Sequence, residues 1–153
     1  MPDPSFAPFT TQHGITLAAG IAFIAACLVL GRRGGRTELA TRAVLAFICL
    51  TATVFTSWAW SHVRRASDID NVVPLHLCDL AAFLAGFALI TKNRTLCLLT
   101  YFWGLAGTIQ GVATPALDIG WPHPAFLSFF SHHFAVIAAA IYLPVVLGWR
   151  AER

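Results

Sequence analysis

The chain has 153 residues, of which 58% are hydrophobic and 11% are charged, and its formal net charge is +3. Soluble domains carry about a quarter charged residues, so this chain has too little charge to cover a water-facing surface. The composition, with a mean hydropathy of +0.72, excludes an ordinary soluble domain. It predicts a single transmembrane domain over residues 1–153.

Several apolar runs approach the roughly 20 residues that a helix needs to cross the hydrocarbon core of a bilayer. The predicted spans are, approximately, Ile15–Leu30, Ala43–Ser61, Pro74–Thr91, Thr95–Thr114 and Phe126–Trp149. The predicted fold class is therefore an all-α, polytopic bundle of about five membrane-spanning helices. Pro144 lies inside the last run and is expected to kink its helix. Gly107 and Gly111 form a GxxxG pair, which is expected to pack against a neighbouring helix.

The basic residues predict the orientation, because lysine and arginine stay on the cytoplasmic side. When sides alternate along the chain, only Arg64 and Arg65 fall on one side, and the others share the opposite side: Arg32, Arg33, Arg36, Arg42, Lys92, Arg94, Arg150 and Arg153. We therefore expect the N-terminus outside and the C-terminus in the cytoplasm. The first span lacks the features of a cleaved signal peptide, so it is expected to be retained. The positive charge reports topology and gives no sign of nucleic-acid binding.

With this topology, all 6 histidines fall in the outer half of the membrane or just above it: His13, His62, His76, His123, His132 and His133. Anchoring at the interface explains His13, His62 and His123 taken singly. His76, Asp79 and His132 lie within predicted spans, where ionisable residues usually mark a functional site. A purely structural hydrogen-bond network is the alternative for these three residues.

Helical spacing predicts which of these side chains can meet. His76 and Asp79 are three residues apart, so they share a helix face and can form a hydrogen bond. Ser128, His132, Ala135 and Ala139 form a stripe that is expected to face the bundle interior, because small residues allow close packing in lipid. His133 is turned about 100° away from that stripe and is the weaker candidate.

The cysteines separate into two groups. Cys27, Cys49 and Cys97 fall near the inner ends of their spans, whereas Cys78 lies towards the outer face. A disulfide needs Cα atoms within about 7 Å, so Cys78 has no expected partner. A lone cysteine near histidines is a candidate nucleophile, and a small buried packing residue is the alternative. Since no HxxxH or CxxC spacing occurs, we expect neither a metal nor another cofactor.

Three segments of the sequence carry a family resemblance: VPLHLCDLAAFLAGFAL, LTYFWGLAGTIQGVATPAL and WPHPAFLSFFSHHFAVIAAAIYL. They resemble the YwaF-like bacterial integral membrane family, which is related to eukaryotic transmembrane protein 164. The blocks PLHLCDL and FFSHHF are the more specific ones, and TTQHG before the first span also fits. The eukaryotic relative is described as a cysteine-dependent acyltransferase that moves acyl chains onto lysophospholipids.

The resemblance implies a multi-pass protein of the bacterial inner (plasma) membrane whose partner is membrane phospholipid. Members of that family usually continue past the fifth span with two further helices and an asparagine-containing motif, whereas this sequence stops at GWRAER. We therefore expect either a homo-oligomer or an incomplete protein.

These patterns, together with what the resemblance implies, lead to one hypothesis for a catalytic site. Cys78 would attack the acyl ester, His132 would act as general base, and His76, oriented by Asp79, would protonate the leaving group or stabilise the oxyanion. The expected substrate-binding residues around this site are Gln110, His133 and His13. The alternative is a non-catalytic membrane protein whose histidines form a structural network or bind a lipid or small ligand.

Overall fold

The computed structural model describes residues 5–61 and 77–151, where the regular structure is helical apart from an isolated bridge between Ser5 and Ile119. The elements are α1 (Thr11–Arg32), α2 (Gly35–Ser61), α4 (Leu77–Thr91), α5 (Arg94–Phe102), the π-helical segment η1 (Trp103–Gly107), α6 (Thr108–Ala113) and α7 (Pro124–Val145). The predicted all-α bundle is confirmed.

Within the described part of the chain, 4 helical stretches are long and apolar enough to cross a membrane: Thr11–Arg32, Gly35–Thr56, Arg94–Ala113 and Pro124–Val145. α4 is apolar but shorter, and the first residues of its predicted span, 74–76, lie outside the described residues. Large apolar side chains such as Ile21, Phe47 and Val54 are exposed on the helix surfaces. This chain is therefore a membrane protein with several apolar helices.

Polar caps define where three of the helices begin. The side chain of Thr10 accepts a hydrogen bond from the His13 backbone N–H at the start of α1. Asn93 caps α5 through two backbone N–H groups, and His123 caps α7 just before Pro124. These side chains satisfy N–H groups that have no partner inside the helix.

The connection from α1 to α2 is very short and needs glycine. Gly34 and Gly35 have φ values of 72° and 54°, which lie in the left-handed region that glycine adopts without steric cost. The turn lets α2 begin at Gly35, earlier than the predicted start at Ala43. The charged residues Glu38 and Arg42 thus become part of a helix, and the contacts that accommodate them are described below.

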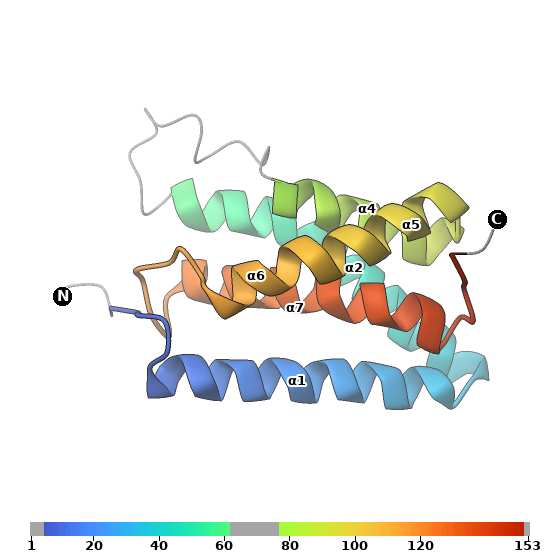
Figure 1. The fold of residues 1–153 in the computed structure, drawn as a ribbon, viewed down its shortest axis with the longest axis horizontal. Helices are drawn as coiled ribbons and strands as arrows, with labels where there is room; N and C mark the ends of the chain where they lie inside the picture. The colour runs from blue at the N-terminus through green and yellow to red at the C-terminus, as the bar shows by residue number, and fades with distance from the viewer. Residues whose placement is uncertain (1–4, 62–76, 152–153) are drawn as a thin grey trace.

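α7 is the central helix of the bundle. It packs against α1 on one side and against α4 and α5 on another, and the start of α1 and the end of α7 lie at opposite ends of the bundle (Figure 1). Ser128, His132, Ala135 and Ala139 are all buried, so the predicted inward-facing stripe is confirmed. The small side chains allow neighbouring backbones to approach closely.

The fourth predicted span is continuous but irregular. η1 widens the helix between α5 and α6, and the Thr108 hydroxyl donates to the Trp103 carbonyl five residues earlier. A Cβ atom at Gly104 would lie 2.7 Å from Ala140 Cβ, whereas one at Gly107 would meet nothing within 4 Å. The prediction that Gly107 packs against a neighbour is therefore wrong, because the wider turn changes the face on which it lies.

The fifth predicted span ends earlier than expected. α7 ends at Val145, and the chain turns at Gly148, whose φ is 66°, before reaching Trp149. Pro144 is the penultimate residue of the helix. It lies at the end of α7 instead of within its length, so the structure does not place it where it would kink a continuing helix, as the sequence predicted.

Candidate functional site

A buried polar cluster lies where the first turn of α4 meets the middle of α7. His132 is 1% exposed and Asp79 is 4% exposed. His132 Nε2 lies 2.8 Å from the backbone oxygen of Cys78, and His132 Nδ1 lies 3.9 Å from Asp79 Oδ1. The two nitrogen atoms of one ring are therefore both directed at the start of α4.

The hydrogen bond to Cys78 fixes the proton arrangement of His132. A carbonyl oxygen only accepts hydrogen bonds, so Nε2 carries a hydrogen. In the neutral ring the lone pair then lies on Nδ1, which faces the carboxyl group of Asp79. At 3.9 Å the two atoms are too far apart for a direct hydrogen bond. Asp79 and His132 are nevertheless neighbouring groups that can each take up a proton.

Sequence spacing predicted His76 as a partner of Asp79, and His76 lies outside the described residues, so that pairing stays a prediction. The structure also places His132 beside Asp79, although it lies on another helix, 53 positions further along the chain (132 minus 79). Spacing along one helix finds only neighbours on that helix, so it could not indicate a contact between α4 and α7.

Cys78 is half-buried in the first turn of α4. The backbone N–H groups of Cys78 and Asp79 belong to this first turn and have no partner within the helix. Such N–H groups stabilise negative charge. The neighbouring side chains of Leu77 and Leu80 are exposed. The thiol therefore lies close to a lipid-facing surface and beside donors for an anion.

The predicted role of His132 as a base for Cys78 needs a change of geometry. Its Nε2 donates to the carbonyl oxygen of Cys78, so that nitrogen has no lone pair with which to accept the thiol proton. The structure supports a positioning role for Nε2 and leaves Nδ1, next to Asp79, as the basic atom. His132 thus holds the backbone that carries the cysteine.

His133 is also buried, although it faces a different helix. Its Nδ1 donates to the Phe129 carbonyl at 2.7 Å, and its ring lies 4.2 Å from that of Phe129. A Cβ atom added to Gly111 would come within 3.0 Å of His133 Nε2. His133 is therefore turned away from the stripe that contains His132, as its helical position predicted. It faces α6 and packs against Gly111 there.

His13 is 1% exposed and both of its nitrogen atoms are engaged. Nε2 lies 2.9 Å from the Val112 carbonyl, and Nδ1 accepts from the Phe9 backbone N–H at 3.0 Å. The ring also has an edge contact with Phe6. This arrangement ties the segment before α1 to the end of α6, so the structure supports a structural role over the predicted contact with substrate.

Gln110 is exposed on α6, whereas its neighbours Thr108 and Val112 are buried. The sequence predicted that Gln110, together with His132, faces the residues around Cys78 and binds substrate there, and this exposed position does not support that prediction. The π-helical segment immediately before α6 changes the register of the helix, so Gly111 rather than Gln110 lies against α7 at His133. Regular helical spacing could not predict that change.

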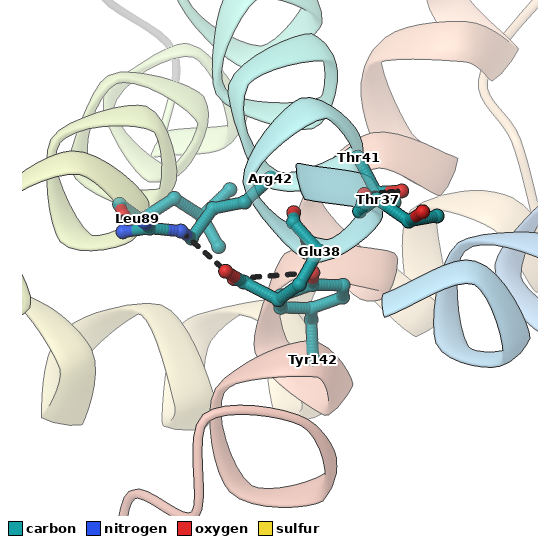
Figure 2. Close-up of polar contacts among 6 residues, drawn as sticks. All are labelled: Thr37, Glu38, Thr41, Arg42, Leu89 and Tyr142. Atoms are coloured by element: carbon teal, nitrogen blue, oxygen red, sulfur yellow. Dashed lines mark hydrogen bonds and ion pairs between the residues drawn. The ribbon is translucent and has the colours of Figure 1, made fainter. Parts of the chain in front are cut away.

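A second polar cluster, which the sequence analysis missed, lies near the other end of α7 (Figure 2). Arg42 Nε is 2.9 Å from Glu38 Oε1, and Arg42 Nη1 donates to the Leu89 carbonyl at 3.1 Å. The Tyr142 hydroxyl is 3.3 Å from the Glu38 carbonyl and 3.4 Å from its carboxylate. An opposite-charge pair at i,i+4 immediately before an apolar run was the available signal.

The remaining cysteines are not part of either cluster. Cys27, Cys49 and Cys97 are buried, and all four cysteines are free thiols. Among the residues that the structure describes, no group of three or more histidine, cysteine or acidic residues has a metal-binding arrangement. Cys78 is thus the most exposed of the four thiols, consistent with its predicted separation from the other three.

Comparison with known proteins identifies a family. The model of the TMEM164 family matches residues 8–153. No curated protein and no solved structure matches the chain. The predicted relation to transmembrane protein 164 is therefore confirmed, whereas the YwaF-like bacterial origin stays a prediction.

Proposed function

The chain belongs to the TMEM164 family, and we propose that it is a membrane-embedded acyltransferase in which Cys78 carries an acyl chain from one phospholipid to another. The observation that carries this proposal is the contact of the buried Asp79 and His132 with the turn that holds Cys78. It unites a nucleophile, a proton acceptor and anion-stabilising N–H groups from two helices.

The burial of Asp79 supports a chemical role. An ionisable side chain inside an apolar bundle is costly, and such residues usually mark a path or a site. Asp79 is 4% exposed and its histidine neighbour is 1% exposed. A buried pair stabilises a fold less well than apolar residues of the same size often do, so stability alone is a poor reason for its presence.

In the proposed first half-reaction, Cys78 Sγ attacks the carbonyl carbon of a phospholipid ester. The thiol proton passes to the pair of Asp79 and His132, and a sulfur–carbon bond forms. Negative charge develops on the carbonyl oxygen, where the first-turn N–H groups of α4 are available as donors. The ester carbon–oxygen bond then breaks, and the pair returns the proton to the departing oxygen, which leaves as the hydroxyl of a lysophospholipid.

The second half-reaction reverses these steps with a different acceptor. The hydroxyl of a lysophospholipid attacks the thioester and gives its proton to the pair of Asp79 and His132. The carbon–sulfur bond breaks, the new ester forms and the thiolate takes the proton back. No oxidant, reductant or metal is needed for this sequence. His132 is a positioning residue through Nε2 and a proton-holding residue through Nδ1.

Access from the membrane supports lipid as the substrate class. Leu77 and Leu80, which lie in the same turn as the half-buried Cys78, are exposed. A lipid ester can therefore approach the first turn of α4 laterally, without entering a closed cavity. Such access suits a substrate that remains in the bilayer during the reaction.

Transfer of a labelled acyl chain tests this proposal. Purified protein in phosphatidylcholine vesicles should move the label to added lysophospholipid, and Cys78→Ser should abolish transfer, because a serine hydroxyl is far less acidic than a thiol. Cys27→Ser, which changes a buried cysteine in α1, is the matched control and should retain transfer. Folded wild-type protein without transfer, or a Cys78→Ser variant with full transfer, would show that the proposal is wrong.

We also propose that the protein lies in the bacterial inner membrane with its N-terminus outside. The arginine-rich turn between α1 and α2 would then face the cytoplasm. An impermeant maleimide should label an Asp118→Cys variant in intact cells and an Arg33→Cys variant only after lysis; both positions are exposed. Labelling of position 33 in intact cells would reverse the proposed orientation.

A further inference from the structure

A groove of about 730 Å³ runs between α1 and α7, on the side of α7 away from the candidate site. Ile48 of α2 contributes to its lining, and Phe23 of α1 and Phe134 of α7 are among its apolar residues. Ser131 lines this groove, whereas the next residue, His132, contacts α4. The groove and the pair of Asp79 and His132 therefore belong to different faces of the same helix.

The polar residues of the groove lie in one part of it. Gln12, Thr16 and Ser131 lie in the first halves of α1 and α7, among apolar residues such as Ile15 and Phe126, while Phe23 lies further along α1. The hydroxyls of Thr16 and Ser131 donate to carbonyl groups of their own helices, so their oxygen atoms can still accept. The Gln12 amide adds a donor nearer the start of α1.

The length of the groove matches one leaflet of a bilayer. Its lining on α1 extends from Gln12 to Phe23, which at 1.5 Å per residue is about 16 Å. One leaflet contributes roughly half of the ~30 Å hydrocarbon core, or about 15 Å. The volume also falls within the range of roughly 300–1,000 Å³ that is typical of ligand pockets. Ile15 and Leu127, which also line the groove, are exposed, so it opens towards lipid.

We propose that this groove is a binding site for one acyl chain of a phospholipid from the leaflet at which α1 begins. The Gln12 amide donates to the ester carbonyl of the lipid, and the acyl chain lies along Ala19 and Phe23 against Phe134. Since the groove and the candidate site lie on different faces of α7, this lipid is a resident ligand and is not the reacting substrate.

Photochemical crosslinking tests the site without reference to activity. The full chain is reconstituted in phosphatidylcholine vesicles that contain a small fraction of phosphatidylcholine with a diazirine on its acyl chain, and modified peptides are mapped by mass spectrometry. We expect adducts to concentrate on Ala19, Phe23 and Phe134. Ala19→Trp, which fills the groove, should reduce them to the level found at exposed α1 positions outside it, such as Ile21.

Ala18→Trp is the matched control, because Ala18 is exposed on the same turn and does not line the groove; its adducts should remain at the wild-type level. Ala19→Leu provides a milder filling variant if Ala19→Trp does not fold, and it should give a partial loss. Equal labelling of Ala19→Trp and Ala18→Trp would overturn the proposal. Uniform labelling around α1, or crosslinks that join two copies of the protein through the groove, would also overturn it.

Discussion

The two polar clusters of this bundle are similar in composition but different in what they can do. Each joins a carboxyl group to a basic side chain at a contact with α7, and His132 and Tyr142 lie 10 positions apart on that helix (142 minus 132), about 15 Å. Arg42 Nε lies 2.9 Å from Glu38 Oε1, and an arginine side chain keeps its proton. His132 Nδ1 lies 3.9 Å from Asp79 Oδ1, and a histidine side chain readily exchanges its proton.

This difference separates a structural contact from a chemical one. The cluster around Glu38 connects α2 to α4 through the Leu89 carbonyl and to α7 through Tyr142. Glu38 and Arg42 carry opposite charges, and the Arg42 guanidinium stays protonated. The cluster around Asp79 contains two neighbouring groups that can each take up a proton, and it lies beside the half-buried thiol of Cys78. We therefore expect mutations in the first cluster to change stability and mutations in the second to change activity.

Among variants that compare the two polar clusters, Asp79→Asn should have the largest effect. This variant keeps the size of the side chain but removes the carboxylate that holds the proton with His132. Acyl transfer should fall by about 10²–10⁴-fold, the usual contribution of a positioned acid–base group. Asp118→Asn, at an exposed position, is the control and should leave transfer unchanged in the same vesicle assay. Equal losses in the two variants would remove the distinction between Asp79 and an ordinary surface carboxylate.

Glu38→Gln should have the opposite pattern. Arg42 would lose its charged partner while remaining mostly buried, which should lower the free energy of unfolding by about 1–3 kcal/mol. Thermal denaturation in detergent measures the change, and the folded fraction should retain its transfer activity per molecule. A large loss of activity at unchanged stability would mean that the cluster around Glu38 is not merely structural.

A smaller residue change probes the packing of the same cluster. A Cβ atom at Gly31 would lie 2.5–2.8 Å from the ring and hydroxyl of Tyr142, so Gly31→Ala should displace that ring and cost about 1–3 kcal/mol. Gly14→Ala on the same helix meets nothing within 4 Å and should be neutral or stabilise the fold by roughly 0.5–1 kcal/mol. Similar melting temperatures for the two variants would contradict the close contact at Tyr142.

Tyr142→Phe should have the smallest effect. It removes only a hydroxyl whose contacts with Glu38 are long, at 3.3 and 3.4 Å. The expected loss is about 1 kcal/mol, in the range of a net hydrogen bond, with unchanged acyl transfer. A loss several times larger, measured by the same denaturation experiment, would show that the hydroxyl organises the whole cluster.

Much of the fold could be predicted from the sequence because a bilayer restricts which secondary structures can span it. Apolar runs of sufficient length must form helices there, so the runs predicted four of the helical stretches well. Their ends were less certain, since α2 begins at Gly35 and includes Glu38 and Arg42, whose partners Tyr142 and Leu89 come from other helices. η1 was not predictable, because a π-helical turn has no simple pattern of apolar residues.

The site was predictable in its residues but not in its contacts. Ionisable residues inside apolar runs identified Asp79 and His132 as candidates. Their contact depends on which helices are neighbours, and residue spacing carries no such information. The same limit explains why Gln110 was expected beside His132: its exposed position follows from the irregular turn before α6.

Detection of an acyl group on Cys78 is the most direct measurement of the central claim. Folded protein incubated with phosphatidylcholine, without an acceptor, should gain the mass of one acyl chain on the peptide that contains Cys78, and hydroxylamine should remove it as expected for a thioester. The adduct should be absent from Cys78→Ser and strongly reduced in Asp79→Asn. No adduct on folded wild-type protein, or an adduct on Cys27, Cys49 or Cys97 instead, would contradict the assignment of Cys78 as the nucleophile.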